Sequence, residues 1–455
     1  MKVIIIGAGE VGHHIAASLS SEGLDAVVID RSQERLHEIS ETLDVQTVLG
    51  SGSSPEVLKR AGMAQAEMVI AVTDSDETNM IACLLASAQC RVPVRIARIR
   101  NLELNENCSL FGADRLNIDL VINPEQEAVD NVMNLLEYPG AAEVFSFAEG
   151  RIRLLGFQID PGAAVVGKSL IDLRAMEPDF RILITSIARG DRLIVPKGDS
   201  VIEEGDYLFA VTDTARVRKL LRFFGKNTER PKRIIIIGGG TNGLVLAQAI
   251  EKQDIAVKII EKKKGRCEQL AALLQKTVVL HGDGTSQELL REENIAGTDF
   301  FIAVTNDEEA NILGSLLAKQ MGARKVLSLI NRIDYIPLVS RVGIDGVINP
   351  RHAAISRILH YIRKGKVLSV APLRDERAEV FEFIALETSE IADRPFKDIH
   401  FPSGTIVGAI SRGEEIIIPD GNSVILPGDH VVIFTPRSAI GQLEKLLTVK
   451  LEYFG

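Results

Sequence analysis

Two glycine-rich stretches are the parts of this 455-residue chain whose residue types and spacing indicate chemistry. Each follows a short apolar run, has the pattern Gly-x-Gly-x-x-Gly, and precedes a second apolar run that ends in a carboxylate. In such a pattern the glycines permit a tight turn, close approach of a pyrophosphate and close helix packing. Amides at the start of the next helix bind the phosphates, and the carboxylate binds the adenosine ribose. The sequence therefore predicts two dinucleotide sites, with an empty scaffold of the same fold as the alternative for each.

The first predicted site combines a loop, a carboxylate and residues that follow later strands. Asp30 favours NAD over NADP because a carboxylate repels a 2′-phosphate, although the adjacent Arg31 is a group that binds such a phosphate. Ligands lie beyond the carboxyl ends of parallel strands, which places Ser51 near the adenine and Thr73 near the middle of the cofactor. Two arginines of the fifth strand either meet a phosphate or pair with exposed acids. The site consists of Gly7, Ala8, Gly9, Glu10, Val11, Gly12, Asp30, Ser51, Gly52, Thr73, Asp74, Arg98 and Arg100.

The second predicted site has the same plan with different side chains. Glu261 replaces the aspartate, and the three lysines that follow it either attract further phosphate or begin a solvated helix. Asp283 is expected to accept a hydrogen bond from the adenine amino group more strongly than its counterpart Ser51. The site consists of Gly238, Gly239, Gly240, Thr241, Asn242, Gly243, Glu261, Asp283, Gly284, Thr305 and Asn306.

Both sites belong to a unit that occurs twice. "FIAVTNDEEANILGSLLA" in the second half repeats "VIAVTDSDETNMIACLLA" in the first, and "VINP" closes the region in both. A second pair follows, because "LIVPKGDSVIEEGDYLFAV" matches "IIIPDGNSVILPGDHVVIF". Such self-similarity indicates one structural unit used twice. The predicted domains are 1–123 and 232–348, which bind nucleotide, and the smaller lobes 143–227 and 368–453, with a polar linker near 226–232.

The nucleotide-binding regions are predicted to be doubly wound. In the first copy, apolar runs alternate with segments of helical spacing, and this alternation implies a parallel sheet with helices on both faces. The predicted strands are 2–6, 25–29, 45–49, 68–73, 94–99 and 119–122. The smaller lobes have short β-branched runs between Gly, Pro and Asp, typical of an α+β module. The fold class is α/β, with two Rossmann-type lobes, each followed by a small α+β lobe, in tandem.

Local signals mark helix starts and one apolar helix face. Ser53 with Glu56, and Thr285 with Glu288, have capping-box spacing. Segment 125–136 is predicted to be a crossover helix whose apolar stripe a homodimer would bury, so we expect a homo-oligomer. The stripe consists of Ala128, Val129, Val132 and Leu136.

Composition excludes several classes of protein. The net charge of −10 is spread along the chain, whereas a nucleic-acid-binding protein needs a basic face. The four cysteines form no Cys-x-x-Cys pair, so we predict no metal site and a reducing compartment. No apolar run approaches the roughly 20 residues of a membrane span, and Met1 leads directly into a strand-like run. We expect a soluble intracellular protein without a signal peptide.

An NAD-dependent oxidoreductase is the alternative function. It would need a proton donor or acceptor such as histidine beside the nicotinamide, held by a substrate domain. None of the eight histidines recurs at a matching position in both halves. We therefore predict no catalytic residue and favour a regulator, in which ligands shift a conformational equilibrium through their different affinities for its two states.

The motifs "IIIGAGEVG", "VVID", "VTDSDETN" and "INPE", with their counterparts after residue 230, resemble those of the peripheral regulatory subunits of bacterial Trk-type potassium uptake systems. Those subunits consist of tandem RCK domains, and the resemblance covers essentially the whole chain. It implies a homo-oligomeric ring, for which we expect a tetramer, at the cytoplasmic face of the inner membrane. It also implies an integral-membrane potassium channel subunit as the partner.

The same resemblance implies cofactors and residue roles. The expected ligands are NAD+ or NADH, together with ATP or ADP. The phosphate loops fall on Gly7–Val11 and Gly238–Gly243, the ribose acids on Asp30 and Glu261, and the "AR" arginine on Arg98. In the second copy Ile330 stands opposite that arginine. The missing cation puts equal nucleotide binding by the two lobes in doubt.

Overall fold

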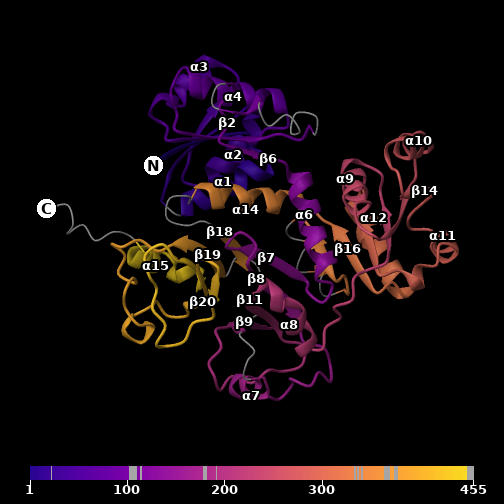
Figure 1. Ribbon diagram of the computed structural model, residues 1–455. Coiled ribbons are helices and arrows are strands. Elements are labelled where there is room, and N and C mark those ends of the chain that lie inside the picture. Colours follow the sequence, from indigo (N-terminus) through magenta and orange to yellow (C-terminus); the bar gives the residue numbers. More distant parts are fainter. Residues whose placement is uncertain are drawn as a thin grey trace. The chain divides into compact units, whose positions relative to one another are not determined.

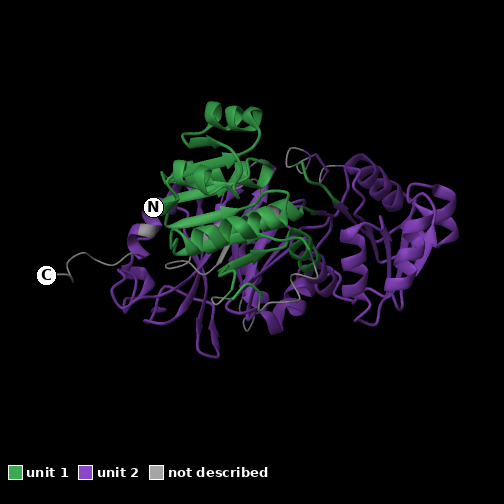
Figure 2. Cartoon of the chain, turned by 90° about the horizontal axis from the view of Figure 1, so that it is seen from above, with its two compact units in different colours: residues 1–130, 329–333, 348–361 green, residues 131–328, 334–347, 362–455 purple. Residues whose placement is uncertain are grey.

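The computed structural model describes residues 1–447 apart from 22, 102–109, 113–114, 178–181, 191, 333–334, 336–337, 340–341, 363–368 and 374–377. The chain forms two compact units (Figure 2). The first contains residues 1–130, 329–333 and 348–361, and the second contains the remainder. Among the described helices, none is both long and apolar enough to cross a membrane.

A six-stranded parallel sheet forms the centre of the first unit (Figure 1). Its strands are β1 (Lys2–Ile6), β2 (Asp25–Asp30), β3 (Gln46–Leu49), β4 (Met68–Ala71), β5 (Val94–Arg98) and β6 (Leu120–Ile122). Its helices are α1 (Glu10–Ser21), α2 (Gln33–Thr42), α3 (Pro55–Arg60) and α4 (Asp76–Ala88). The strand order β3-β2-β1-β4-β5-β6 changes direction between β1 and β4, where ligands bind to sheets of this kind. The predicted doubly wound lobe is confirmed.

The two central strands explain the apolar runs in the sequence. All four residues of β4 and the last four of β1 are buried, because helices cover both faces of a parallel sheet. β4 ends at Ala71, two residues before the end of the predicted strand. Thr73 and Asp74 therefore lie in the loop that leads into α4, at the carboxyl edge of the sheet.

The predicted capping boxes are wrong by one residue. Pro55 is the first residue of α3 and keeps the preceding Ser54 extended, so Ser54 is the N-cap. The Ser53 hydroxyl instead lies 2.9 Å from Ser51 Oγ. In the second copy Ser286 caps α11 (Gln287–Glu292), while the Thr285 hydroxyl donates to Asp283. The side chains of Ser53 and Thr285 are thus used by the loop and not by the helix.

Two helices that follow the parallel sheets depart from the sequence-based picture. The predicted crossover helix is α6 (Pro124–Glu137), but its whole apolar stripe is buried within the single chain and cannot serve as a homodimer seam. Its tandem counterpart α14 (Pro350–Ile362) lies almost entirely in the first unit, beside α1 (Figure 1). The Nε of Arg357 in α14 lies 3.8 Å from the Oε1 of Glu127 in α6.

The second unit contains a second parallel sheet with the matching strand order β14-β13-β12-β15-β16-β17. Its strands are β12 (Arg233–Ile237), β13 (Ala256–Glu261), β14 (Val278–His281), β15 (Phe300–Ala303), β16 (Lys325–Leu329) and β17 (Gly346–Ile348). Its other helices are α9 (Thr241–Ile250), α10 (Lys264–Leu273) and α12 (Glu308–Gln320). The repeat in the sequence is therefore a repeat of topology.

The smaller lobes are two five-stranded sheets, both in the second unit. The first has β7 (Glu143–Phe147), β8 (Ile152–Gln158), β9 (Leu183–Arg189), β10 (Arg192–Ile194) and β11 (Tyr207–Asp213), with α7 (Leu170–Met176) and α8 (Val217–Phe223). The second has β18 (Ser369–Leu373), β19 (Ala378–Ile384), β20 (Ile406–Arg412), β21 (Glu415–Ile417) and β22 (His430–Pro436), with α15 (Ile440–Leu447). Their strand pairs are antiparallel, as expected for the predicted α+β modules.

The two smaller lobes share one hydrophobic core. Phe147, Leu154 and Phe209 of the first sheet belong to the same buried cluster as Val432 and Phe434 of the second. All five side chains are at most 1% exposed. The sequence predicted two smaller lobes without indicating a contact between them, and these apolar side chains join the two.

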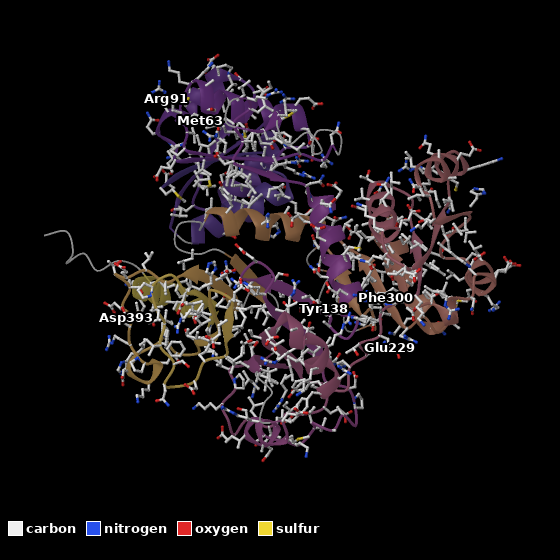
Figure 3. The ribbon with its side chains drawn as sticks, viewed as in Figure 1. Met63, Arg91, Tyr138, Glu229, Phe300 and Asp393 are labelled. Carbon is white, nitrogen blue, oxygen red and sulfur yellow. The ribbon has the colours of Figure 1, made fainter. Side chains whose placement is uncertain are left out.

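Lys325, the first residue of β16, has an enclosed amine. Its Nζ donates to the carbonyl of Ala141 at 2.8 Å and lies 5.9 Å from the ring centroid of Phe300, which Figure 3 labels. Burial lowers the pKa of Lys325 to about 8, and two further lysines lower it as well. Two nearby carboxylates act in the opposite direction. These charged neighbours are Lys226, Lys319, Asp345 and Asp160.

Replacing Lys325 by methionine is expected to change how stability depends on pH. Above pH 8 the folded protein releases this proton while the unfolded chain keeps it, so stability rises between about pH 8 and pH 10.5. The full rise is at most about 3 kcal/mol. Urea unfolding of the wild type should show it, and Lys325→Met should lose it while becoming no less stable at pH 7. An unchanged pH profile in Lys325→Met would show that the amine titrates normally.

Candidate functional site

The first glycine loop joins β1 to α1, and its three glycines have different roles. Gly7 has φ +112°, and a Cβ at Gly12 would lie 1.8 Å from the carbonyl oxygen of Gly7. These two glycines are therefore required by the fold. A Cβ at Gly9 would meet nothing closer than Arg35 Nη1 at 3.9 Å. The space above Gly9 is thus open, as the approach of a pyrophosphate requires.

Asp30 holds this loop from the end of β2. Its Oδ2 accepts a hydrogen bond from the amide of Ala8 at 2.6 Å, and its Oδ1 accepts one from the amide of Ser32 at 2.8 Å. A carboxylate bonded in this way is fixed in orientation beside the glycine loop. Each oxygen can accept a further hydrogen bond, so the geometry is compatible with the predicted binding of ribose hydroxyls.

Thr73 is held by a residue that the sequence-based site omitted. The Oδ1 of Asn79 accepts hydrogen bonds from the amide and the hydroxyl of Thr73 at 2.9 and 2.7 Å. The Nδ2 of Asn79 donates to the carbonyl of Arg98 at 2.8 Å. Asn79 is fully buried and thus fixes the ends of β4 and β5 together. Its signal was present in the sequence, because Asn311 occupies the matching place in the second copy.

Arg98 and Arg100 come together on Asp74. The distances from Arg98 Nη1 and Arg100 Nη2 to Asp74 Oδ1 are 3.6 and 3.5 Å. The Arg98 side chain is 12% exposed, and burial is the main cause that lowers the pKa of its guanidinium. Its Nε has no hydrogen-bond partner among the described residues. Arg98 is therefore an enclosed cation with a donor left over, at the carboxyl edge of the sheet.

The predicted adenine end of the first site is rich in hydroxyl groups and has a cation beside them. Arg31 Nη2 donates to Ser51 Oγ at 2.8 Å. A Cβ at Gly52 would lie 2.1 Å from Ile6 Cγ2, so Gly52 is required for packing against β1. Arg31 thus lies beside Ser51, where its guanidinium partly offsets the repulsion between Asp30 and a 2′-phosphate.

The second loop repeats the first. Glu261 accepts hydrogen bonds from the amides of Gly239 at 2.8 Å and Lys263 at 2.7 Å, as Asp30 does in the first copy. A Cβ at Gly243 would lie 1.9 Å from the carbonyl oxygen of Gly238. A Cβ at Gly240 would have no atom within 4 Å. The second site therefore keeps both the locked loop and the open face.

The side chains around the second loop are different. Asp283 accepts hydrogen bonds from the amide and hydroxyl of Thr285 and from Lys262 Nζ, and these lower the pKa of Asp283 to about 2. The predicted adenine end thus has an ionised carboxylate, paired with Lys262, where the first site has Ser51. Thr305 is held by Asn311, as in the first copy, and Asn306 is exposed in the same loop.

Two further residues mark the difference between the copies. The Oδ1 of Asn242 is buried without a hydrogen-bond partner among the described residues. The strand register corrects the sequence-based pairing of Ile330 with Arg98. Ser328 pairs with Ala303 as Ala97 pairs with Ala71, so the counterpart of Arg98 is Leu329. Leu329 is buried and apolar, so this position supplies no cation.

No group of three or more His, Cys, Asp or Glu side chains in the described part of the chain is arranged to hold a metal ion. Cys83, Cys90 and Cys267 are free thiols, and Cys108 lies outside the described residues. Burial raises the pKa of Cys83 to about 12, so this thiol is unreactive at neutral pH.

Comparison with known proteins shows the family. The model of the TrkA-N domain matches residues 3–124 and 234–350, and that of the TrkA-C domain matches 154–225 and 380–448. The Trk system potassium uptake protein TrkA of Halomonas elongata is 41% identical over 458 residues and covers all of both chains. The chain belongs to the TrkA family. The protein of the same name from Haemophilus influenzae is 39% identical and covers 98% of each chain.

Both of these relatives are named as potassium uptake proteins of a Trk system and not as enzymes. Among solved structures, the GsuK RCK domain matches 98% of this chain and 94% of its own at a TM-score of 0.60 and 18% identity. The GsuK channel bound to NAD matches 98% and 78%, with a TM-score of 0.60 and 17% identity. At these identities the likeness confirms the tandem RCK fold alone.

Proposed function

We propose that this TrkA-family chain binds NAD+ or NADH at the first glycine loop and thereby regulates potassium uptake without turning the nucleotide over. The observation that carries the proposal is the contrast within one loop. Gly7, Gly12 and Asp30 lock the backbone, while the face above Gly9 is open at the amino terminus of α1. That end of a helix favours phosphate.

The second loop is proposed to bind an adenine nucleotide as well, with ATP or ADP as the preferred class. It lacks the enclosed cation of Arg98, and Asp283 adds a carboxylate suited to accept from the adenine amino group. The two sites thus differ in their charged groups, because Arg98 is present only in the first and Asp283 only in the second. This difference supports different nucleotide preferences. We propose that the residues predicted for each site line the bound nucleotide.

The proposed partner is an integral-membrane potassium channel subunit, with this chain bound peripherally at the cytoplasmic face of the inner membrane. A homo-oligomer, expected to be a tetramer, is retained as a proposal, but α6 no longer supports it because its stripe is already buried. Solubilised membranes should yield one integral protein that co-purifies with the chain, in an amount that changes when NADH is added. Association with no integral protein would contradict this part of the proposal.

Replacing Asp30 by alanine tests the nucleotide site. The change removes the acceptor for the ribose and for the amide of Ala8, and affinity for NADH should fall about ten- to a hundredfold. NADH fluorescence is a suitable signal because the chain contains no tryptophan. Glu261→Ala, the matching change in the second copy, is the control and should leave the first site unchanged. Equal NADH affinity in wild type and Asp30→Ala would overturn the placement of the site.

A further inference from the structure

The first phosphate loop contains an acid of its own. Glu10 is the first residue of α1, one position after the open glycine Gly9. A carboxylate there lies beside the position proposed for the nucleotide phosphates, and like charges at such short range oppose binding. The second copy avoids this conflict, because Thr241 occupies the matching place. The first site therefore needs a cation that the second does not.

That cation is present, and it comes from the other half of the chain. Arg351 of α14 forms an ion pair with Glu10 through its Nη1 and the carboxylate Oε2. The side chains of Arg351 and Glu10 are 40% and 32% exposed, so the pair is partly enclosed and still open on one side. Both residues belong to the first unit, although α14 follows the second parallel sheet.

The chemistry of the guanidinium allows it to hold two anions. It is planar, stays charged at neutral pH and has five N–H donors, whereas one carboxylate uses at most two of them. The remaining donors suit the paired oxygens of a phosphate. The position that matches Arg351 in the first copy, directly after "VINP", is Glu125, which has the opposite charge. The ion pair is therefore a feature of the first site alone.

We propose that Arg351 completes the first nucleotide site from the second half of the chain, exchanging part of its contact with Glu10 for the phosphates of the bound nucleotide. This inference rests on the proposed function. It makes α14 the element that registers whether the first site is occupied, because the partner of its arginine differs between the empty and the filled loop. A ligand shifts a conformational equilibrium only through such a difference.

The test compares four full-length proteins in which Gly240→Val has silenced the second site. They are the parent, Arg351→Gln, Glu10→Gln and the Glu10→Gln/Arg351→Gln double variant. Calorimetric titration with NADH and with ADP, at low and high salt, gives the affinity of the first site. Arg351→Gln should weaken both ligands about tenfold and reduce the salt dependence of binding. Glu10→Gln should bind at least as tightly as the parent.

The double variant separates contact from charge compensation. If Arg351 touches the phosphates, the double variant stays about tenfold weaker than Glu10→Gln. Arg357→Gln is the matched control, since it removes the same charge from the same helix and breaks the pair with Glu127 outside the loop; its affinity should equal that of the parent. The melting temperature without ligand checks that each variant is folded.

Two results would overturn the inference and leave the proposed function standing. One is parental affinity in Arg351→Gln, and the other is full recovery of parental affinity in the double variant, which would mean that Arg351 only screens Glu10. Failure of the parent itself to bind either nucleotide would instead overturn the proposed function, and this inference with it.

Discussion

Replacing Gly9 by valine is expected to abolish NADH binding at the first site while leaving the fold intact. The wild-type structure offers space for the new side chain, because a Cβ there has Arg35 Nη1 as its nearest atom at 3.9 Å. That space is the one that the pyrophosphate is proposed to fill, so two occupants compete for it. No saturable binding should remain at NADH concentrations up to about 1 mM, a loss of at least roughly a hundredfold for a micromolar site.

The matched control for Gly9→Val is Gly240→Val in the second loop, where a Cβ again has open space around it. Each variant should lose one site, and the double variant should lose both. The unfolding midpoint without nucleotide should stay close to that of the wild type in all three. Tight NADH binding by the double variant would show that the ligand lies elsewhere.

Replacing Gly12 by alanine is expected to destabilise the first unit severely, although the side chain added is a single methyl group. Its Cβ would lie 1.8 Å from the carbonyl oxygen of Gly7, and 2.9 Å from the carbonyl carbon. Backbone atoms cannot move aside as a flexible side chain can, so α1 must shift away from β1. Overpacking typically costs about 1–3 kcal/mol, and a clash with fixed backbone belongs at or above the upper end of that range.

Urea denaturation measures this loss, and Gly265→Ala is its control. Gly265 lies in α10, and a Cβ there has no atom within 4 Å. Alanine at that place should leave stability unchanged or raise it by up to about 1 kcal/mol. Gly12→Ala should also lose NADH binding, but only together with its fold, in contrast to Gly9→Val. Wild-type stability in Gly12→Ala would show that α1 does not pack on the loop as described.

The sequence predicted the parts of this fold that depend on local pattern. The strands β1 and β4 are continuous apolar runs because both of their faces are buried, and such runs are visible without a structure. The glycine loops are equally local, since Gly7, Gly9 and Gly12 act within six residues of chain. The repeat supplied a check, because the same pattern returns at Gly238, Gly240 and Gly243.

Contacts between distant segments could not be predicted in the same way. Nothing in the spacing of Arg351 indicates that it meets Glu10, because that pairing depends on α14 joining the first unit. The shared core of the smaller lobes depends on two sheets meeting face to face. The burial of the α6 stripe also depends on tertiary contacts, so its apolar pattern alone suggests a subunit interface. Asn79 is an intermediate case, since its recurrence as Asn311 could have identified it.

The most direct test of the account is a crystal structure of the full chain grown with saturating NADH. We expect density for the intact dinucleotide, with its pyrophosphate within hydrogen-bond distance of the amides of Glu10 and Val11. The adenosine ribose should lie against Asp30, and the nicotinamide should show no covalent change. An empty first loop at saturating NADH, with the dinucleotide bound elsewhere or not at all, would contradict the account.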